Sequence, residues 1–405
     1  MTISNIQGLQ RFISLDVIRG IAILGILIMN IQNFSMIGQA YINPTAYGNF
    51  TGANKWVWVI SHVVADQKFM TIFSILFGAS ILLITEKAQE KGKSPCRVHY
   101  ARNFWLLVIG TVHSYILWYG DILFPYALCS FFVFFFRRLS IRKLLIFGII
   151  IFSVASIIYL LLGLSLPYWP EDAVNGLISS WRPGQELIEQ EINAYRGSLA
   201  SQVGQTIKAA NMMHTSVFLF FFFWRITGLM MIGMALYKSG FLTGIWEVSR
   251  YKRMLLWTAP LGLCLIIYGI MKNFDANWSV QYSMFLGSQF NYWGSLFLAL
   301  GYLAAINLGV LSGKFKPFLM IFSAVGRQAL SNYLFQTLIC ISIFYGFGLG
   351  LFGKVEQTGQ IVIVMGVWII QIIFSQWWQT KFHYGPFEWL WRSATFMKWQ
   401  SFIKR

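Results

Sequence analysis

Histidine and carboxylate residues occur in pairs within apolar stretches of the sequence. His62 and Asp66 are four residues apart, which places them on one face of a helix. His113 is followed by Asp121 in a short turn. A histidine titrates near neutral pH, so it is suited to general acid–base chemistry. Together with Asn30, these residues are the candidate catalytic set, and we expect them to line one outward-facing polar cavity.

A second group of polar residues lies close to positively charged segments. Asp16 and Arg19 are three residues apart on one helical face. Arg327 precedes an apolar segment, where its guanidinium and a helix N-terminus could meet a phosphate, and Asn332 follows in the same segment. Arg19, Arg327 and Asn332 are therefore the candidate residues for binding a phosphate-bearing cofactor.

Each of these groups also has a purely structural interpretation. Asp16 and Arg19 can form an ion pair, and Asn332 can form hydrogen bonds between helices. His62 and His113 can each be satisfied within a helix bundle. No haem spacing occurs, and the four cysteines share no CxxC spacing, so we expect no metal site.

The composition indicates a membrane protein. The chain has 405 residues, of which 57% are hydrophobic and 11% charged, and its mean hydropathy is +0.60. A soluble domain is about a quarter charged, so too few charges remain to cover a soluble surface of this size. Apolar runs of about 20 residues recur along the chain. These features exclude secreted, disordered and nucleic-acid-binding classes.

We expect an all-α polytopic helix bundle with about ten transmembrane helices, because lipid offers no partner for free backbone groups. Each span is long enough to cross about 30 Å of hydrocarbon, although one is short. The predicted spans cover residues 13–36, 56–83, 103–119, 122–136, 144–166, 215–237, 254–272, 290–311, 328–350 and 360–379.

The distribution of Lys and Arg sets the topology. With the N-terminus inside, 23 of the 31 Lys and Arg residues fall in cytoplasmic segments, and only Lys68 and Arg225 lie within the membrane. By the positive-inside rule both termini are cytoplasmic. The net charge of +17 therefore reflects topology and contact with membrane lipids, and no nucleic-acid partner is expected. Because Lys68 is predicted at mid-depth, we expect it to have an acidic partner such as Asp66.

The chain is expected to form a single membrane domain over residues 1–405 with two segments outside the lipid. Residues 167–213 form an outer loop in which we expect short surface helices, acting as a connector or a lid. Residues 381–405 form an aromatic, basic tail at the cytoplasmic interface. Small residues in several spans would also permit a homodimer.

Several motifs resemble those of known families. Residues 11–20 (RFISLDVIRG), with Asn30 eleven residues after Arg19, resemble the first span of the transmembrane acyltransferase superfamily, which includes heparan-α-glucosaminide N-acetyltransferase. The whole chain resembles the YeiB-like family of bacterial membrane proteins. The stretches that carry this resemblance are residues 68–78, 113–123, 228–233, 326–333 and 385–392. The resemblance implies a multi-pass protein of the bacterial plasma membrane.

The acyltransferase relatives move an acyl group from cytosolic acyl-CoA to an acceptor on the far side of the membrane, using a membrane-embedded His near the first-span Asn. Asn30 matches that Asn, but Tyr41 stands eleven residues after it, so His62 or His113 would take the role of the His. The resemblance therefore implies transfer from acetyl-CoA or a longer acyl-CoA to a small-molecule or glycan acceptor of the envelope.

In this scheme each candidate residue has an expected role. Arg19 and Arg327, with the basic segment 87–102, would attract the CoA phosphates. A His would act as general base or transient acyl carrier, oriented by Asp66 or Asp121. Asn30 would donate to the developing oxyanion.

Two other functions use the same residues differently. A proton-coupled transporter or flippase for a small solute or lipid would use Asp66, Lys68 and Arg225 as its substrate or proton site. The absence of recognisable inverted repeats counts mildly against that function. A non-catalytic scaffold or sensor would bind a partner through residues 167–213.

Overall fold

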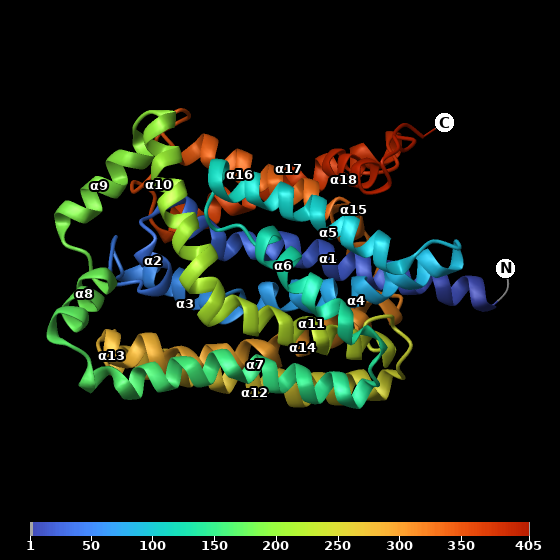
Figure 1. The fold of residues 1–405 in the computed structure, drawn as a ribbon, viewed down its shortest axis with the longest axis horizontal. Coiled ribbons are helices and arrows are strands. Elements are labelled where there is room, and N and C mark those ends of the chain that lie inside the picture. Colours follow the sequence, from blue (N-terminus) through green and yellow to red (C-terminus); the bar gives the residue numbers. More distant parts are fainter. Residues whose placement is uncertain (1–2, 405) are drawn as a thin grey trace.

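The computed structural model describes residues 3–404, and the side chains of residues 13–404. This part of the chain is built from helices and contains no strand, only an isolated bridge between Phe382 and Ile403. Most helices run along the long axis of the molecule, and both ends of the described chain lie toward the same end of the bundle (Figure 1). The prediction of an all-α polytopic bundle is confirmed.

Seven helical segments of the described chain are long and apolar enough to cross a membrane. They comprise α1 (Ile3–Ser35, from Ile13), α3 (Gly52–Val64) with α4 (Lys68–Glu90), α7 (Ile141–Ser165), α10 (Leu199–Met212) with α11 (Phe223–Lys238), α12 (Val248–Asp275), α13 (Val280–Tyr282) with α14 (Ser288–Leu311), and α17 (Gln357–Lys381).

The other three predicted spans correspond to helices that are not among these seven. They are α5 (Pro95–Val112) with the π-helical turn η1 (His113–Leu117), α6 (Leu123–Val133), and α16 (Ala329–Phe344). These helices pack against α4, α1 and each other, although α5 also keeps large apolar side chains such as Phe104 and Val112 exposed. The described part of the chain thus gives seven candidate membrane spans where about ten were predicted, and the other three predicted spans fall on helices that do not meet the length and hydropathy of a span.

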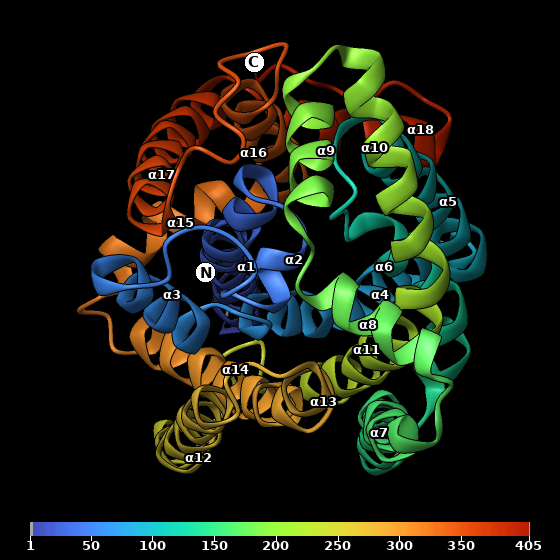
Figure 2. The same ribbon diagram turned by 90° about the vertical axis from the view of Figure 1, so that its left-hand side faces the viewer.

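Short helices cover the end of the bundle opposite the termini. They are α2 (Gln39–Ile42), α8 (Glu171–Trp181) and α9 (Gln185–Arg196), and Figure 2 views the molecule onto them. The Glu191 carboxylate accepts from the Gly38 backbone N–H at 3.0 Å, and Arg196 donates to the Phe352 carbonyl at 2.6 Å. Burial raises the pKa of Glu191. Much of the predicted outer loop is thus helical and hydrogen-bonded to the bundle.

Glycines allow the central helices to approach at backbone distance. At the contact of α1 with α15 (Lys316–Arg327), a Cβ on Gly20 would lie 1.9 Å from the Phe322 carbonyl oxygen, and one on Gly326 would lie 1.9 Å from the Asp16 carbonyl oxygen. In membranes, where lipid is as apolar as the helix surface, such close backbone packing is a main source of helix association.

Two breaks separate consecutive helices at buried positions of the bundle. Residues 65–67 separate α3 from α4, and Gln67 adopts a left-handed conformation with φ of 63°. Gln328, which is buried, separates α15 from α16. Away from water, the backbone groups freed at each break need partners from the protein. Most of the polar residues described below lie at or near these two breaks.

The glycine contact gives a prediction about stability. We expect Gly20→Val to lower the free energy of unfolding by at least about 1–3 kcal/mol, because the added side chain overlaps the α15 backbone. The matched control is Gly366→Val in α17, since a Cβ on Gly366 would meet nothing within 4 Å. Thermal unfolding midpoints of the purified protein in detergent measure both effects. Equal midpoints for the two variants would contradict this account of the α1–α15 contact.

Candidate functional site

The break between α3 and α4 brings a lysine to the end of a helix. The last carbonyls of α3 have no partner within the helix, as at any helix C-terminus. Lys68 Nζ donates to the His62 carbonyl at 2.7 Å, and the Tyr302 hydroxyl donates to the Val64 carbonyl at 3.1 Å. Lys68 itself is fully buried. Its ammonium therefore completes the backbone hydrogen bonding of the break.

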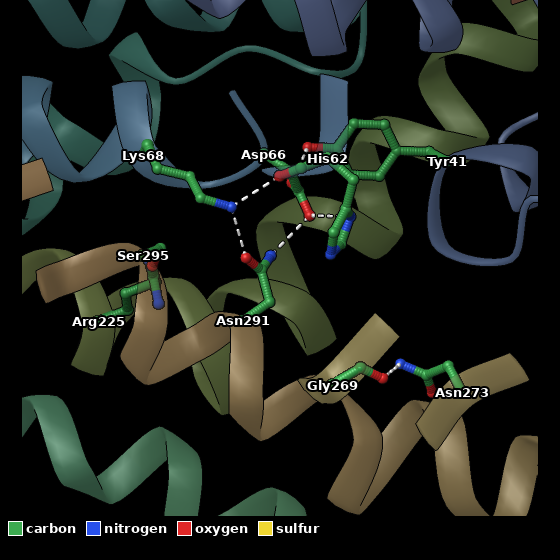
Figure 3. A network of polar contacts seen from close by, with 9 residues as sticks. All are labelled: Tyr41, His62, Asp66, Lys68, Arg225, Gly269, Asn273, Asn291 and Ser295. Carbon is green, nitrogen blue, oxygen red and sulfur yellow. Dashed lines mark hydrogen bonds and ion pairs between the residues drawn. The ribbon is translucent and has the colours of Figure 1, made fainter. Parts of the chain in front are cut away.

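A network of hydrogen bonds, which we call the Asp66 cluster, surrounds this break (Figure 3). Asp66 accepts from Asn291 at 2.7 Å and from the Tyr41 hydroxyl at 3.3 Å, and its carboxylate lies 3.1 Å from His62 Nδ1. The Asn291 amide oxygen in turn accepts from Lys68 Nζ at 2.7 Å. The acidic partner expected for Lys68 is thus Asp66, reached through the amide of Asn291.

Arg225 lies beside this cluster and is also fully buried (Figure 3). Its guanidinium donates to the Thr71 hydroxyl at 2.9 Å and to the Ser295 hydroxyl at 2.8 Å. The cation also lies 4.5 Å from the centre of the Tyr292 ring, a cation–π contact. Neutral hydroxyls and an aromatic face therefore hold the Arg225 charge within α4, α11 and α14.

A second set of hydrogen bonds, which we call the His113 triad, joins three elements. His113 opens η1, directly after α5, and its Nδ1 lies 2.7 Å from Asp121 Oδ1. His113 Nε2 lies 2.9 Å from the Thr337 hydroxyl on α16. The other Asp121 oxygen accepts from the Phe124 backbone N–H at 2.7 Å, at the N-terminus of α6. The His113 and Asp121 side chains are at most 1% exposed.

The geometry of the triad fits one placement of its proton. An ionised carboxylate only accepts hydrogen bonds, so beside an ionised Asp121 a neutral His113 ring would carry its proton on Nδ1 and donate it to Asp121. Nε2 is then free to accept the proton of the Thr337 hydroxyl. This is the tautomer that a general base needs, with its basic nitrogen directed at a hydroxyl.

A groove of about 670 Å³ leads to the triad. The groove runs along α5 as far as His113. The part of α5 from Trp105 to His113 is about 12 Å long at the rise of an α-helix. The other walls come from α16 and from α18 (Pro386–Phe396) with the residues after it. The lining is almost entirely apolar and comprises Trp105, Val108, Ile109, Val112, His113, Leu117, Leu334, Leu338, Phe387, Leu390, Trp391, Ser393, Ala394, Met397, Lys398 and Trp399.

Basic residues surround the α18 end of this groove. The Arg102 guanidinium stacks on the Trp391 ring at 3.7 Å, and Lys93 lies over the Phe396 ring at 4.5 Å. Lys398 lines the groove itself. Cations held on aromatic faces keep their charge while their stems pack against apolar surface. The groove therefore has a basic end at α18 and an imidazole in its wall along α5.

The residues expected to bind a cofactor lie at the break between α15 and α16. Arg19 forms an ion pair with Asp16 at 3.0 Å, and Arg327 is exposed at the end of α15. The Asn332 amide donates to the carbonyls of Val325 and Gln328 at 3.2 and 3.1 Å. Asn332 therefore satisfies the backbone of the break, and only Arg19 and Arg327 present charge toward solvent.

The helix N-terminus expected to meet a phosphate carries a carboxylate of the protein. Glu388, on α18, accepts from the backbone N–H groups of Leu330 and Ser331 at 2.6 and 3.1 Å. Burial raises the pKa of Glu388, and the hydrogen bonds from Ser331 and the backbone oppose this shift. An anion near Arg327 would therefore be bound by side chains and not by the start of α16.

The residues that were expected to line one outward cavity lie in separate groups. The structure places His62 and Asp66 in one hydrogen-bonded cluster and His113 and Asp121 in another. Asn30 is half-buried on α1, and among the described residues no hydrogen bond joins it to either cluster. Depth along the membrane normal was the basis of the single-cavity prediction, and depth does not tell which neighbouring helix a residue faces.

Three residues of these sites were not singled out from the sequence. Thr337 and Asn291 are polar residues of ordinary type within apolar helices, and only their partners distinguish them. His214 stacks on the Phe124 ring at 3.9 Å, next to the triad, but it lies one residue before a predicted span. Including the flanks of each span in the search for titratable residues would have found His214.

Comparison with known proteins identifies the family. The chain is 32% identical over 396 residues to the uncharacterised protein YeiB of Escherichia coli (strain K12). The aligned region covers 96% of this chain and 97% of YeiB. The chain belongs to the YeiB-like family. It is also 33% identical over 417 residues to the uncharacterised protein YxaH of Bacillus subtilis (strain 168), covering 98% of this chain and 97% of YxaH.

The two remaining comparisons do not indicate an activity. A family described as "Protein of unknown function (DUF418)" matches residues 236–398. No solved structure matches the chain.

The Asp66 cluster gives a prediction about charge balance. We expect Asp66→Asn to destabilise the protein by about 3–5 kcal/mol, because Lys68 is then buried without a carboxylate. Adding Lys68→Met should recover a large share of this loss, since both charges are then absent. Unfolding midpoints of the wild type, both single variants and the double variant form a double-mutant cycle.

The control for this cycle is an exposed ion pair. Lys272 and Asp275 lie 3.0 Å apart with side chains 43% and 66% exposed, and we expect Asp275→Asn to change the unfolding midpoint far less than Asp66→Asn does. Strictly additive losses for Asp66→Asn and Lys68→Met would show that the two buried charges are not coupled.

Proposed function

We propose that the protein transfers an acyl group from cytosolic acyl-CoA to an acceptor on the outer side of the bacterial plasma membrane. The observation that carries this proposal is the apolar groove with His113 in its wall. Acyl transfer needs a base near the reacting carbonyl and a dry channel for the donor, and the groove and triad together offer both.

The charge distribution suits a CoA donor. The 3′,5′-ADP and pyrophosphate parts of CoA are anionic, whereas the pantetheine arm is long and narrow. Lys93, Arg102 and Lys398 stand at the α18 end of the groove, on the side that the positive-inside rule assigns to the cytoplasm. Phosphates held there would leave the arm directed along α5 toward His113. Arg19 and Arg327 would add to the positive potential that attracts the donor.

The similarity of the first span to the transmembrane acyltransferase superfamily supports the same reaction. Asn30 stands where that superfamily has its first-span Asn, and by this resemblance it would donate to the developing oxyanion. Tyr41 stands at the position of the expected His. Between the two remaining candidates we assign the base to His113, because His113 lines the groove whereas His62 is stacked on Trp58 at 4.8 Å in the Asp66 cluster.

Binding and turnover of acyl-CoA test this function. Purified protein in detergent is titrated with acetyl-CoA and with a longer acyl-CoA by calorimetry, and release of the CoA thiol is followed with a chromogenic reagent. We expect Arg102→Ala to weaken binding about tenfold or more, because a charge-assisted contact with phosphate contributes about 1.5–3 kcal/mol.

Variants of the two histidines separate the candidate bases. His113→Ala should bind acyl-CoA but lose CoA release, by about a hundredfold or more if His113 is the base. His62→Ala is the matched control and should retain release. Absence of acyl-CoA binding by the wild type would contradict the proposal.

Proton-coupled transport is the second candidate, and the broken helix α3–α4 favours it. Transporters place charged residues at discontinuous helices, and Asp66 and Lys68 lie at the break between α3 and α4. In proteoliposomes, a proton-coupled carrier would show flux driven by a pH gradient that Asp66→Asn abolishes and His113→Ala leaves intact. The reverse pattern of sensitivity is expected for acyl transfer.

A further inference from the structure

Thr337 uses its hydroxyl differently from most helical threonines and serines of this protein. Thr71, Ser74 and Thr111 each donate to the carbonyl four residues earlier in their own helix, at 2.8 to 2.9 Å. Thr337, in contrast, is paired across helices with His113 Nε2 at 2.9 Å, and among the described residues no bond to its own helix is seen. Its hydroxyl is therefore directed at a base.

The three side chains of the triad have the order that activates a nucleophile. A hydroxyl bonded to an imidazole, whose other nitrogen is bonded to a carboxylate, is the arrangement by which serine hydrolases generate an attacking oxygen. Here the two distances are 2.9 Å and 2.7 Å. The three residues come from α16, η1 and the turn before α6, so the arrangement is made by tertiary packing and not by one helix.

The groove reaches the region of this hydroxyl. Leu334 and Leu338 flank Thr337 on α16, and both line the groove, as does His113. Thr337 is 1% exposed, so it lies behind the wall that these residues form. A thioester brought along the groove to His113 would therefore stand next to the hydroxyl that His113 activates.

Resting on the acyl-transfer function proposed above, we propose that Thr337 is the catalytic nucleophile and carries the acyl group as an ester between donor and acceptor. In the first half-reaction Thr337 Oγ1 attacks the thioester carbonyl while His113 Nε2 takes its proton. The carbon–sulfur bond breaks, and the CoA sulfur leaves with that proton as the thiol. Asp121 stabilises the imidazolium that exists between these two transfers.

The second half-reaction reverses the roles. A hydroxyl of the acceptor attacks the Thr337 ester while His113 removes the proton of that hydroxyl. The bond between Thr337 Oγ1 and the acyl carbon breaks, and His113 returns the proton to Oγ1. No oxidant or reductant is needed, and the acceptor leaves as the acyl ester.

The proposal differs from direct acylation of the imidazole. His113 Nε2 is the nitrogen that would have to carry an acyl group, and it is already bonded to the Thr337 hydroxyl. A thioester carbonyl approaching from the groove would thus have to displace Thr337 before it could reach Nε2. Attack by the hydroxyl keeps the observed hydrogen bond as the path of the proton.

The experiment uses the full-length protein with acetyl-CoA labelled in the acetyl group. The acetylated residue is located by intact mass and peptide mass spectrometry after an acid quench, and CoA release is measured in parallel. We expect an adduct on Thr337 that resists neutral hydroxylamine and is cleaved by alkaline hydroxylamine, as an oxygen ester is. Thr337→Val, which is isosteric, should lose the adduct and reduce CoA release by about a hundredfold or more.

Two further variants exclude a merely structural role. Thr337→Ser should retain the adduct, whereas Thr337→Cys should form a thioester that neutral hydroxylamine cleaves. This change in chemical lability cannot arise from packing, and unfolding midpoints verify that each variant is folded.

The possible failures are distinguishable. CoA release that persists in Thr337→Val, or an adduct found on His113, would overturn the role of Thr337 while leaving acyl transfer intact. No CoA release from the wild type would overturn both proposals.

Discussion

The arrangement of this molecule depends on one constraint: in the buried interior of the helix bundle, every interrupted backbone hydrogen bond must be replaced from inside the protein. The break between α3 and α4 is completed by Lys68, and the break between α15 and α16 by Asn332 and Glu388. Each replacement brings a polar or charged group inward, and that group needs partners of its own. The Asp66 cluster follows directly from this sequence of requirements.

Hydropathy and charge were sufficient to predict the helix bundle, because the lipid imposes length and polarity on each span independently. The breaks were not predictable in the same way. No proline or glycine marks residues 65–67, and Gln67 is a residue type that rarely adopts the left-handed conformation it has here. The ends of the short helices α6 and α16 were likewise not predicted, and both helices pack against neighbouring helices of the bundle.

Among the candidate residues, too, local contacts were predictable from the sequence and distant contacts were not. Spacing of four residues brings His62 and Asp66 together, and a short turn brings His113 to Asp121, so both pairs follow from local sequence. Thr337 and Asn291 complete the two clusters from more than 200 positions away. Neither residue type is unusual in an apolar helix, and only the packing of α16 and α14 makes them partners. The local histidine–carboxylate pairs could therefore be predicted from the sequence, whereas their distant partners Thr337 and Asn291 could not.

Burial of the His113 triad also bears on which chemistry it can support. A threonyl ester exposed to water would hydrolyse once an adjacent imidazole activated a water molecule, so a carrier of this kind requires a dry site. His113 and Asp121 are at most 1% exposed, and the groove beside them is lined mainly by aliphatic and aromatic side chains. The same packing that stabilises three polar residues within the bundle would thus keep water from the ester. The proposed transferase, unlike a hydrolase, would depend on that exclusion, because its acyl group would have to wait for an acceptor from the other side of the membrane.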